Sequence, residues 1–249
     1  MNSVRLAVSW LTVLPVRGPD TVDRRAAGQA IALAPLVGLL LGGAAAAAMR
    51  LSVAAGLTTL LAGLLTVGLL ALLTRGMHLD GLADTVDGLG SYGPPERARQ
   101  IMKSGGAGPF GVAALIFAIA IQAVAFAALA GEQRWVAIVL AVALGRVAVV
   151  LACRRGIRAA PDSGFGTLVA GTQPLGPVLI WPMAAVVAAV FAVPANLWLG
   201  PVVTVAVLAL TITLTRHCVR RFDGLSGDVL GAVVEITVSL AAVGFSLAG

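Results

Sequence analysis

Seven long apolar stretches restrict the fold of this chain more than any other feature of its sequence. A helix that crosses a bilayer needs about 20 mostly apolar residues. Only 11% of the 249 residues are charged, whereas soluble domains contain roughly 25%, so a water-soluble fold could not cover its own surface. We therefore predict an all-α, polytopic membrane bundle of about seven transmembrane helices, forming a single domain over residues 1–249. The stretches lie at about residues 27–49, 52–73, 109–130, 135–152, 177–194, 197–215 and 229–248.

Basic residues predict how this bundle is oriented, because cytoplasmic loops of membrane proteins are enriched in Lys and Arg. With a cytoplasmic N-terminus and alternating spans, the cytoplasmic segments contain 14 of the 17 basic residues, and the outer loops contain only Arg50 and Arg134. The net charge of +6 then reports topology, so we expect membrane lipid but no nucleic acid as a partner. We expect a multi-pass protein of the bacterial cell (inner) membrane. Residues 4–14 are predicted to add a short interfacial helix, with Trp10 at the lipid headgroups.

Three aspartates, Asp80, Asp84 and Asp87, follow the second apolar stretch at spacings of four and three residues. On a helix these spacings place the side chains on one face, where like charges repel one another. A divalent cation would remove that repulsion, and hard carboxylate oxygens favour magnesium, manganese or calcium over zinc. The pattern predicts catalytic, metal-binding carboxylates, and the alternative is a solvated acidic helix end. The preceding His78 is either a general base for a hydroxyl nucleophile or a hydrogen-bonded structural histidine.

A second acidic pair lies in the last predicted span. Asp228 and Glu235 are seven residues apart and therefore share one helix face. An ionisable side chain inside an apolar span is costly unless it is paired or bound to a metal, which makes both residues candidate metal ligands. In the alternative reading, an ion pair between Glu235 and Arg146 only holds helices together; otherwise Arg146 is a candidate for substrate binding. Gly227 belongs to a polar turn that could direct backbone N–H groups at an anion.

Two basic segments are predicted on the same membrane face as the carboxylates. Residues 96–103 carry Arg97 and Lys103 and lead into a glycine-rich turn that ends at Gly108. This segment either binds a diphosphate or anchors the chain on anionic lipid. For Arg158, in the second basic loop, a functional and a topological role fit equally well. Together, metal-requiring carboxylates, cations and glycine turns on one face suggest phosphate chemistry, with the site facing the cytoplasm.

Four segments, in order along nearly the whole chain, resemble the adenosylcobalamin synthase family, also called adenosylcobinamide-GDP ribazoletransferase or cobalamin 5′-phosphate synthase. The specific segments are residues 78–88 (HLDGLADTVDG) and 224–235 (GLSGDVLGAVVE). Residues 10–16 (WLTVLPV) and 108–111 (GPFG) add support. One departure follows Lys103, where many family members carry an acidic and a basic residue and this chain has Ser104, Gly105 and Gly106. No role is therefore transferred to these three residues.

The resemblance implies a Mg²⁺-dependent phosphotransferase of cobalamin (vitamin B12) biosynthesis. Such an enzyme joins α-ribazole, or its 5′-phosphate, to adenosylcobinamide-GDP: a ribose hydroxyl attacks the phosphate attached to cobinamide, and GMP leaves. By motif match, Asp80, Asp84 and Asp87 would be metal ligands, with Asp228 and Glu235 as candidates for a second cluster. The sequence leaves open the phosphorylation of the acceptor, the number of metal ions and whether the chain forms a homo-oligomer.

Two other functions compete with this one. The segment from Asp84 to Gly88 fits the opening of the aspartate signature of CDP-alcohol phosphotransferases, but the Ala-Arg pair and the downstream aspartates of that signature are missing. An ion or proton transporter could use Asp80, Asp84 and Glu235 as a relay. Such a relay predicts carboxylates spread through the membrane and often inverted repeats. Most of these carboxylates instead lie at one predicted face, and the sequence shows no repeat.

Overall fold

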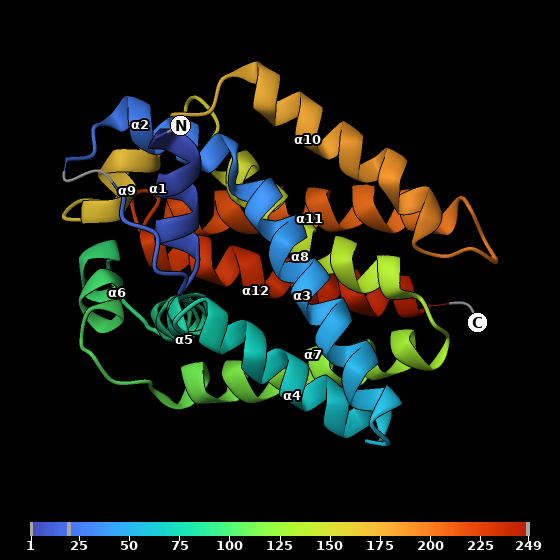
Figure 1. Cartoon of the computed structure of the whole chain (residues 1–249). Helices are drawn as coiled ribbons and strands as arrows, with labels where there is room; N and C mark the ends of the chain where they lie inside the picture. Colours follow the sequence, from blue (N-terminus) through green and yellow to red (C-terminus); the bar gives the residue numbers. More distant parts are fainter. Residues whose placement is uncertain (1, 19–20, 248–249) are drawn as a thin grey trace.

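The chain is helical throughout the part that the computed structural model describes, residues 2–18 and 21–247 (Figure 1). In these two ranges no β-strand occurs, only isolated bridges. The long helices are α3 (Ala34–Ala54), α4 (Thr59–Leu73), α7 (Pro109–Gly131), α8 (Trp135–Ala152), α10 (Leu175–Ala188, extended by the 3-10 turn η1, Ala189–Phe191), α11 (Leu199–Arg221) and α12 (Gly227–Ser246). The shorter helices are α1 (Asn2–Leu11), α2 (Arg24–Ala32), α5 (Met77–Gly90), α6 (Pro95–Met102) and α9 (Gly164–Val169).

The prediction of an all-helical, multi-pass membrane bundle is confirmed. Five helices, α3, α7, α8, α11 and α12, are long and apolar enough to cross a membrane. The bent pair α4–α5 would make a sixth, and the helix over Leu175–Phe191 is apolar but shorter. Each of the seven predicted stretches overlaps one of the long helices, and the fourth, 135–152, has the predicted bounds. Residue 248, the predicted end of the last span, lies outside the described residues.

The first two predicted boundaries are wrong. The chain turns at Leu33, so residues 27–49 are divided between α2 and α3. Pro35 lies in the first turn of α3. Its missing N–H costs no hydrogen bond there, because the N–H groups of the first turn have no partner within the helix. Helix α3 then continues to Ala54 and includes Arg50, which was expected in an outer loop. The second span begins at Thr59 rather than at residue 52, after Thr58 caps its N-terminus.

Helix α5 does not continue the direction of α4. The two helices are bent by 93° at the break between them, where Arg75 (φ 57°) and Gly76 (φ 68°) both adopt left-handed backbone conformations. Glycine accepts this conformation without steric cost, whereas arginine rarely adopts it. The Arg75 side chain donates to the carbonyls of Ser9 and Trp10, which secures the bend against α1. As a result, α5 lies across the end of the bundle and is seen end-on in Figure 1.

Helices α5 and α12 cross with their backbones in contact. A Cβ atom added to Gly81 would lie 2.7 Å from the Asp228 carbonyl oxygen. On the other side of the crossing, a Cβ added to Gly231 would lie 3.0 Å from the His78 carbonyl oxygen and 3.2 Å from the Gly81 Cα. Small residues permit this close approach of helices within membranes. The crossing therefore brings the start of α12 against the first turns of α5.

A second connection ties two loops together at the same end of the molecule. The Leu225 N–H donates to the Arg158 carbonyl (2.9 Å), and the Ala160 N–H donates to the Leu225 carbonyl (3.0 Å). Gly224 (φ 150°) allows this approach, since a Cβ there would lie 2.3 Å from the Ala159 carbonyl carbon. The loop after α8 is therefore held beside the start of α12.

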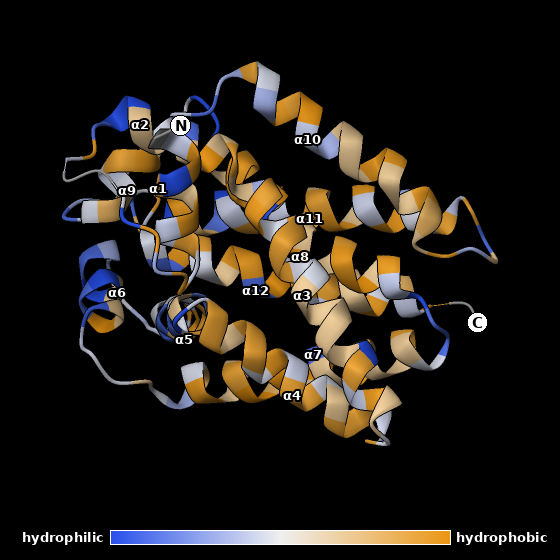
Figure 2. Cartoon of the chain, viewed as in Figure 1, coloured by the Kyte–Doolittle hydropathy of each residue, from blue (hydrophilic) through white to orange (hydrophobic). Residues whose placement is uncertain are grey.

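The surface of the bundle divides its apolar and polar residues between regions. Helix α8 is the central span, and most of its residues are buried inside the protein. Helix α10 has no buried residues and packs on α8 and α11. Figure 2 shows apolar residues along α4, α7 and α10, whereas hydrophilic residues gather at the end formed by α1, α2, α5, α6 and α9. The polar chemistry of the chain is therefore concentrated at one end.

The α5–α12 crossing predicts a position-specific cost for one methyl group. Gly81→Ala should lower the free energy of unfolding by about 1–3 kcal/mol, because the new Cβ overlaps backbone that can only move away. Thermal unfolding in detergent measures the change. Gly43→Ala in α3 is the matched control, since a Cβ there meets nothing within 4 Å. Equal melting temperatures for the two variants would contradict the close crossing.

Candidate active site

Three carboxylates gather where α5 crosses α12. Asp80 and Asp84 lie one turn apart on α5, and Asp228 lies in the first turn of α12, its backbone against Gly81. Burial, followed by the charges of Asp80, Asp228 and Asp87, raises the pKa of Asp84 to about 6. Among the described residues, no side chain forms a hydrogen bond or ion pair with the carboxylates of Asp80 or Asp84. Asp80 and Asp84 therefore carry carboxylates without a side-chain partner, and a cation would relieve their repulsion.

Asp228 is held in place by the start of its own helix. The Ser226 hydroxyl oxygen accepts from the Val229 N–H (3.3 Å), as expected of an N-cap residue. The same hydroxyl lies 3.3 Å from Asp228 Oδ2 and donates to it. The predicted polar turn thus positions the Asp228 carboxylate at the N-terminus of α12.

Asp87 faces a different partner from the other two aspartates of α5. Its Oδ2 accepts from the Gly108 N–H (2.6 Å) and its Oδ1 from the Gly111 N–H (2.9 Å). Asp87 is 8% exposed, and the carboxylate therefore caps the N-terminus of α7, where orphan N–H groups and the helix dipole favour negative charge. Gly108, a candidate substrate contact from the sequence, is used in this cap. Both glycines are required, because a Cβ on Gly111 would lie 2.4 Å from Asp87 Oδ2.

Glu235 is not brought together with Asp228. The two residues share a helix face, but seven residues separate them by about 10 Å along the helix axis. Glu235 Oε2 accepts from Gln122 Nε2 (2.8 Å), inside the bundle. Glu235 and Arg146 line the same cavity of about 20 Å³, room for roughly one water molecule. The ion pairs among the described residues are those of Arg99 and Arg134, so Arg146 and Glu235 line the same cavity without forming an ion pair.

His78 points from α5 to the buried Arg146. Arg146 Nη2 lies 3.4 Å from His78 Nδ1. A guanidinium can only donate, so Nδ1 accepts and the neutral ring carries its proton on Nε2. Burial, followed by the charge of Arg146, lowers the pKa of His78, which favours this neutral form. In this state His78 carries an N–H at Nε2. Its contact with Arg146 is that of a hydrogen-bonded histidine, and a general-base role stays a prediction.

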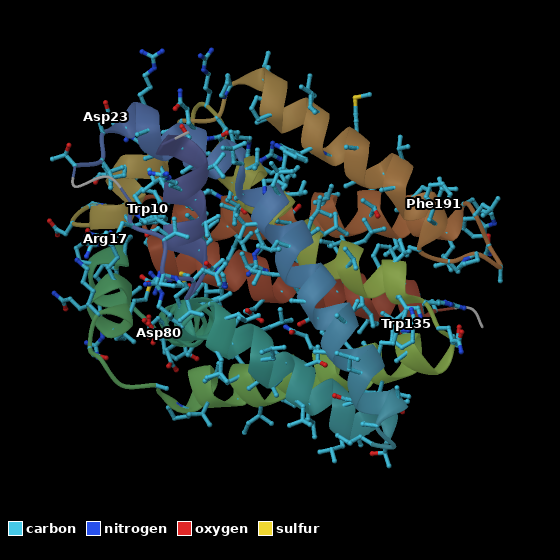
Figure 3. All side chains as sticks on the ribbon, in the orientation of Figure 1. Trp10, Arg17, Asp23, Asp80, Trp135 and Phe191 are labelled. Carbon is cyan, nitrogen blue, oxygen red and sulfur yellow. The ribbon has the colours of Figure 1, made fainter. Side chains whose placement is uncertain are left out.

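Two cavities flank Asp228. The larger, of about 380 Å³, is formed mainly by apolar side chains. It is lined by Trp10, Leu11, Ile31, Arg75, Met77, His78, Asp80, Val149, Phe165, Gly227, Asp228, Leu230, Gly231 and Val234. The smaller, of about 220 Å³, is lined by Arg99, Met102, Lys103, Ala160, Pro161, Asp162, Ser163, Gly164, Phe165, Phe222, Ser226, Gly227 and Asp228. Figure 3 places Trp10 and Asp80 at the same end of the molecule, away from Trp135 and Phe191.

The predicted basic residues separate into two groups. Lys103 lines the smaller cavity, and its Nζ donates to the Asp162 carbonyl (3.2 Å). Arg97 and Arg158 are exposed and belong to neither cavity. Arg99, an arginine of the basic segment at residues 96–103, also lines the smaller cavity and pairs with Asp223 at 3.0 Å. Arg99 stands in the same basic segment as Lys103, but nothing in the local pattern distinguishes the inward arginine from Arg97.

The predicted metal ligands can be compared with the carboxylates that the structure brings together. Within the described ranges, no three His, Cys, Asp or Glu side chains are arranged to hold a metal ion by themselves. Mg²⁺ seldom uses such an all-protein cage: it keeps several waters and is bound through one or two carboxylates plus substrate phosphates. The repelling, unpaired carboxylates of Asp80 and Asp84, next to Asp228, fit that mode of binding.

Comparisons with known proteins agree with the motifs. The family model of cobalamin-5-phosphate synthase matches residues 3–246. A Nocardioides protein named adenosylcobinamide-GDP ribazoletransferase is 42% identical over 236 residues, which cover 94% of each chain. A protein of that name from Corynebacterium efficiens is 38% identical over 248 residues, covering 97% of this chain and 90% of the relative. One from Frankia casuarinae is 40% identical over 261 residues, covering 96% and 92%. No solved structure matches the chain.

The matched family is the one that the segments at residues 78–88 and 224–235 resemble, and the match extends beyond them to nearly all of the chain. Neither a CDP-alcohol phosphotransferase nor a transporter is favoured by these relatives. The chain belongs to the cobalamin-5-phosphate synthase family.

Proposed function

We propose that this protein is the membrane transferase that joins α-ribazole, or its 5′-phosphate, to adenosylcobinamide-GDP and releases GMP. The observation that carries the proposal is the acidic group of Asp80, Asp84 and Asp228, in which Asp80 lines the larger cavity and Asp228 lines both, in a chain whose relatives carry the name of this activity. A transferase needs room for two substrates and a charged centre where they meet. In the proposed arrangement, parts of the two substrates bind in the two cavities, and the acidic group lies where they meet.

Mg²⁺ is the cofactor of the proposed reaction. One or two carboxylates of the group Asp80, Asp84 and Asp228 would hold it, together with oxygens of the substrate diphosphate. Bound there, it offsets the negative charge that develops on the leaving phosphate. Asp87 is omitted from this set because its two oxygens accept N–H groups of α7. Glu235 is omitted because its carboxylate accepts a hydrogen bond from Gln122 inside the bundle.

The reaction is a phosphoryl transfer in which one bond forms and one breaks. A ribose hydroxyl oxygen bonds to the phosphorus attached to cobinamide, the bond from that phosphorus to the bridging oxygen breaks, and GMP leaves with that oxygen. The hydroxyl proton is released to solvent. The chain contributes mainly position and charge, as expected for phosphoryl transfer: Lys103 faces the smaller cavity with its cationic Nζ, and His78 offers an N–H in the larger one.

The site faces the cytoplasm in the proposed topology. Asp80, Arg17 and Asp23 lie at the end of the bundle opposite Trp135 and Phe191 (Figure 3). Hydrophilic residues are most frequent at that same end (Figure 2), and Lys and Arg are retained on the cytoplasmic side of membranes. Placement in the bacterial inner membrane would give the site access to soluble nucleotide substrates.

Neutralising one carboxylate should separate catalysis from stability. Asp84→Asn should abolish GMP release while the protein stays folded, because the amide removes a negative charge from a mutually repelling group. Asp87→Ala is the comparison variant: loss of the α7 cap should lower the free energy of unfolding by about 0.5–2 kcal/mol. The measurements are GMP release and thermal unfolding. Full turnover by Asp84→Asn would reject the assignment of the acidic group.

Magnesium and protons should compete for the acidic group. The pKa of Asp84 is raised to about 6, so its ionised form disfavours the fold as pH rises through that value, and a bound cation relieves this cost. Mg²⁺ should therefore raise the melting temperature more at pH 7.5 than at pH 5. Asp84→Asn should show a smaller difference between the two pH values. A Mg²⁺ effect independent of pH in the unmodified protein would contradict this prediction.

The topology predicts which positions are labelled from each side. Cys153 and Cys218 are buried, so a membrane-impermeant maleimide should report introduced cysteines only. Ser104→Cys, in the loop after α6, should react in inside-out vesicles but not in intact spheroplasts. Ala195→Cys, in the turn before α11, should show the opposite pattern. The reverse result at both positions would place the active site outside.

A further inference from the structure

We infer that the two cavities are separate substrate subsites, with the larger binding the aromatic base of α-ribazole and the smaller binding the phosphates of adenosylcobinamide-GDP. This assignment rests on the proposed function and deepens it by giving each substrate its own residues. Asp228, Gly227 and Phe165 line both cavities and form the boundary at which the two substrates react.

The larger cavity is suited to a flat apolar ring. Its inner wall is formed by Val149 of α8 and Val234 of α12, within the bundle. At its side, Trp10 and Phe165 form an edge-to-face pair with ring centroids 5.1 Å apart and planes inclined by 64°. Its volume of about 380 Å³ lies within the range of small-molecule sites, roughly 300–1,000 Å³. The base of α-ribazole is a methylated benzimidazole, which presents this cavity with an aromatic, apolar surface.

Polar groups of the larger cavity lie where the sugar would be needed. Asp80 and Asp228 come from the crossing of α5 and α12. His78 lines the same cavity, its Nδ1 occupied by Arg146, which leaves the Nε2–H to donate to a hydroxyl. A nucleoside with its base among the apolar residues therefore directs its ribose toward the carboxylates.

The smaller cavity has the chemistry of a phosphate site. Lys103 donates to a backbone carbonyl, that of Asp162, and forms no ion pair among those of the described residues. Among the described residues no carboxylate lies within ion-pair distance of its Nζ, although the charges of Lys103 and Asp228 attract each other. Arg99 also lines this cavity, and its guanidinium pairs with Glu96 and Asp223. Charge-assisted hydrogen bonds from such cations bind phosphate more strongly than neutral donors do.

The boundary between the cavities explains how the substrates meet. Asp228 lines both cavities, and the neighbouring Gly227 has no side chain; a Cβ added there would lie at ordinary contact distance, 3.7 Å, from Phe165. The ribose of one substrate and the phosphate of the other can therefore both approach Asp228. The reacting hydroxyl and phosphorus come from opposite sides of this residue, each held by its own cavity.

Steady-state kinetics of the full-length protein in lipid, with each substrate varied in turn, tests the assignment. Trp10→Ala should raise KM for α-ribazole about tenfold and change KM for adenosylcobinamide-GDP by less than about twofold. Lys103→Ala should show the reverse, with about a tenfold rise in KM for adenosylcobinamide-GDP. Trp198→Ala, at an exposed tryptophan, and Arg220→Ala, at an exposed arginine, are the matched controls and should leave both KM values unchanged.

A conservative variant protects the test from misfolding. Trp10→Phe keeps an aromatic wall, so KM for α-ribazole should stay within about threefold of the unmodified value. α-Ribazole alone, without Mg²⁺ or the second substrate, should quench tryptophan fluorescence of the unmodified protein. Trp10→Phe should lose most of that quenching, because Trp10 is the only tryptophan that lines the larger cavity among the described residues. Undiminished quenching in Trp10→Phe would overturn the assignment.

The outcomes separate this inference from the proposed function. If the unmodified protein releases no GMP from the two substrates, the proposed function fails. If it turns over normally but Trp10→Ala and Lys103→Ala raise the same KM, or each raises the KM assigned to the other, the subsite assignment alone fails.

Discussion

The contact between α5 and α12 is the constraint on which the arrangement of the site depends. At Gly81 and Gly231 neither helix has a side chain, so the two backbones approach until main-chain atoms touch. Leu82 and Ala232 continue the contact as a small apolar cluster with Ala118 of α7. This packing holds carboxylates near one another even though their charges repel. The favourable packing of the two helices thus offsets the repulsion between the carboxylates and keeps them close together.

Much of the fold was predictable because it follows from the length and polarity of segments. A run of apolar residues such as 135–152 must be helical to satisfy its backbone in lipid, and the structure has a helix with these bounds. The turn at Leu33 and the bend at Arg75 were not predictable in the same way. The bend places a non-glycine residue at positive φ, which no local preference favours, and its partners on α1 are distant in sequence.

The site was predictable in its chemistry but not in all its partners. Helical spacing correctly placed Asp80 and Asp84 on one helix, and the polar turn before Asp228 lies where α5 crosses. Spacing does not reveal what faces a helix, and so it could not show that Asp87 meets the start of α7. Trp10 and Phe165 are 155 positions apart, and only the folded chain brings them together. The metal-binding and substrate-binding roles of the site residues stay predictions.

The bend between α4 and α5 has a mechanical consequence. Helix α5 lies across the bundle and is connected at both ends. His78, near its start, contacts α8, and Asp87, near its end, accepts hydrogen bonds at the start of α7. The position of α5, and of the carboxylates it carries, therefore depends on how α7 and α8 are tilted relative to each other. Tilt responds to the thickness of the surrounding bilayer. We therefore expect the acyl-chain length of the host membrane to influence the geometry of the acidic group.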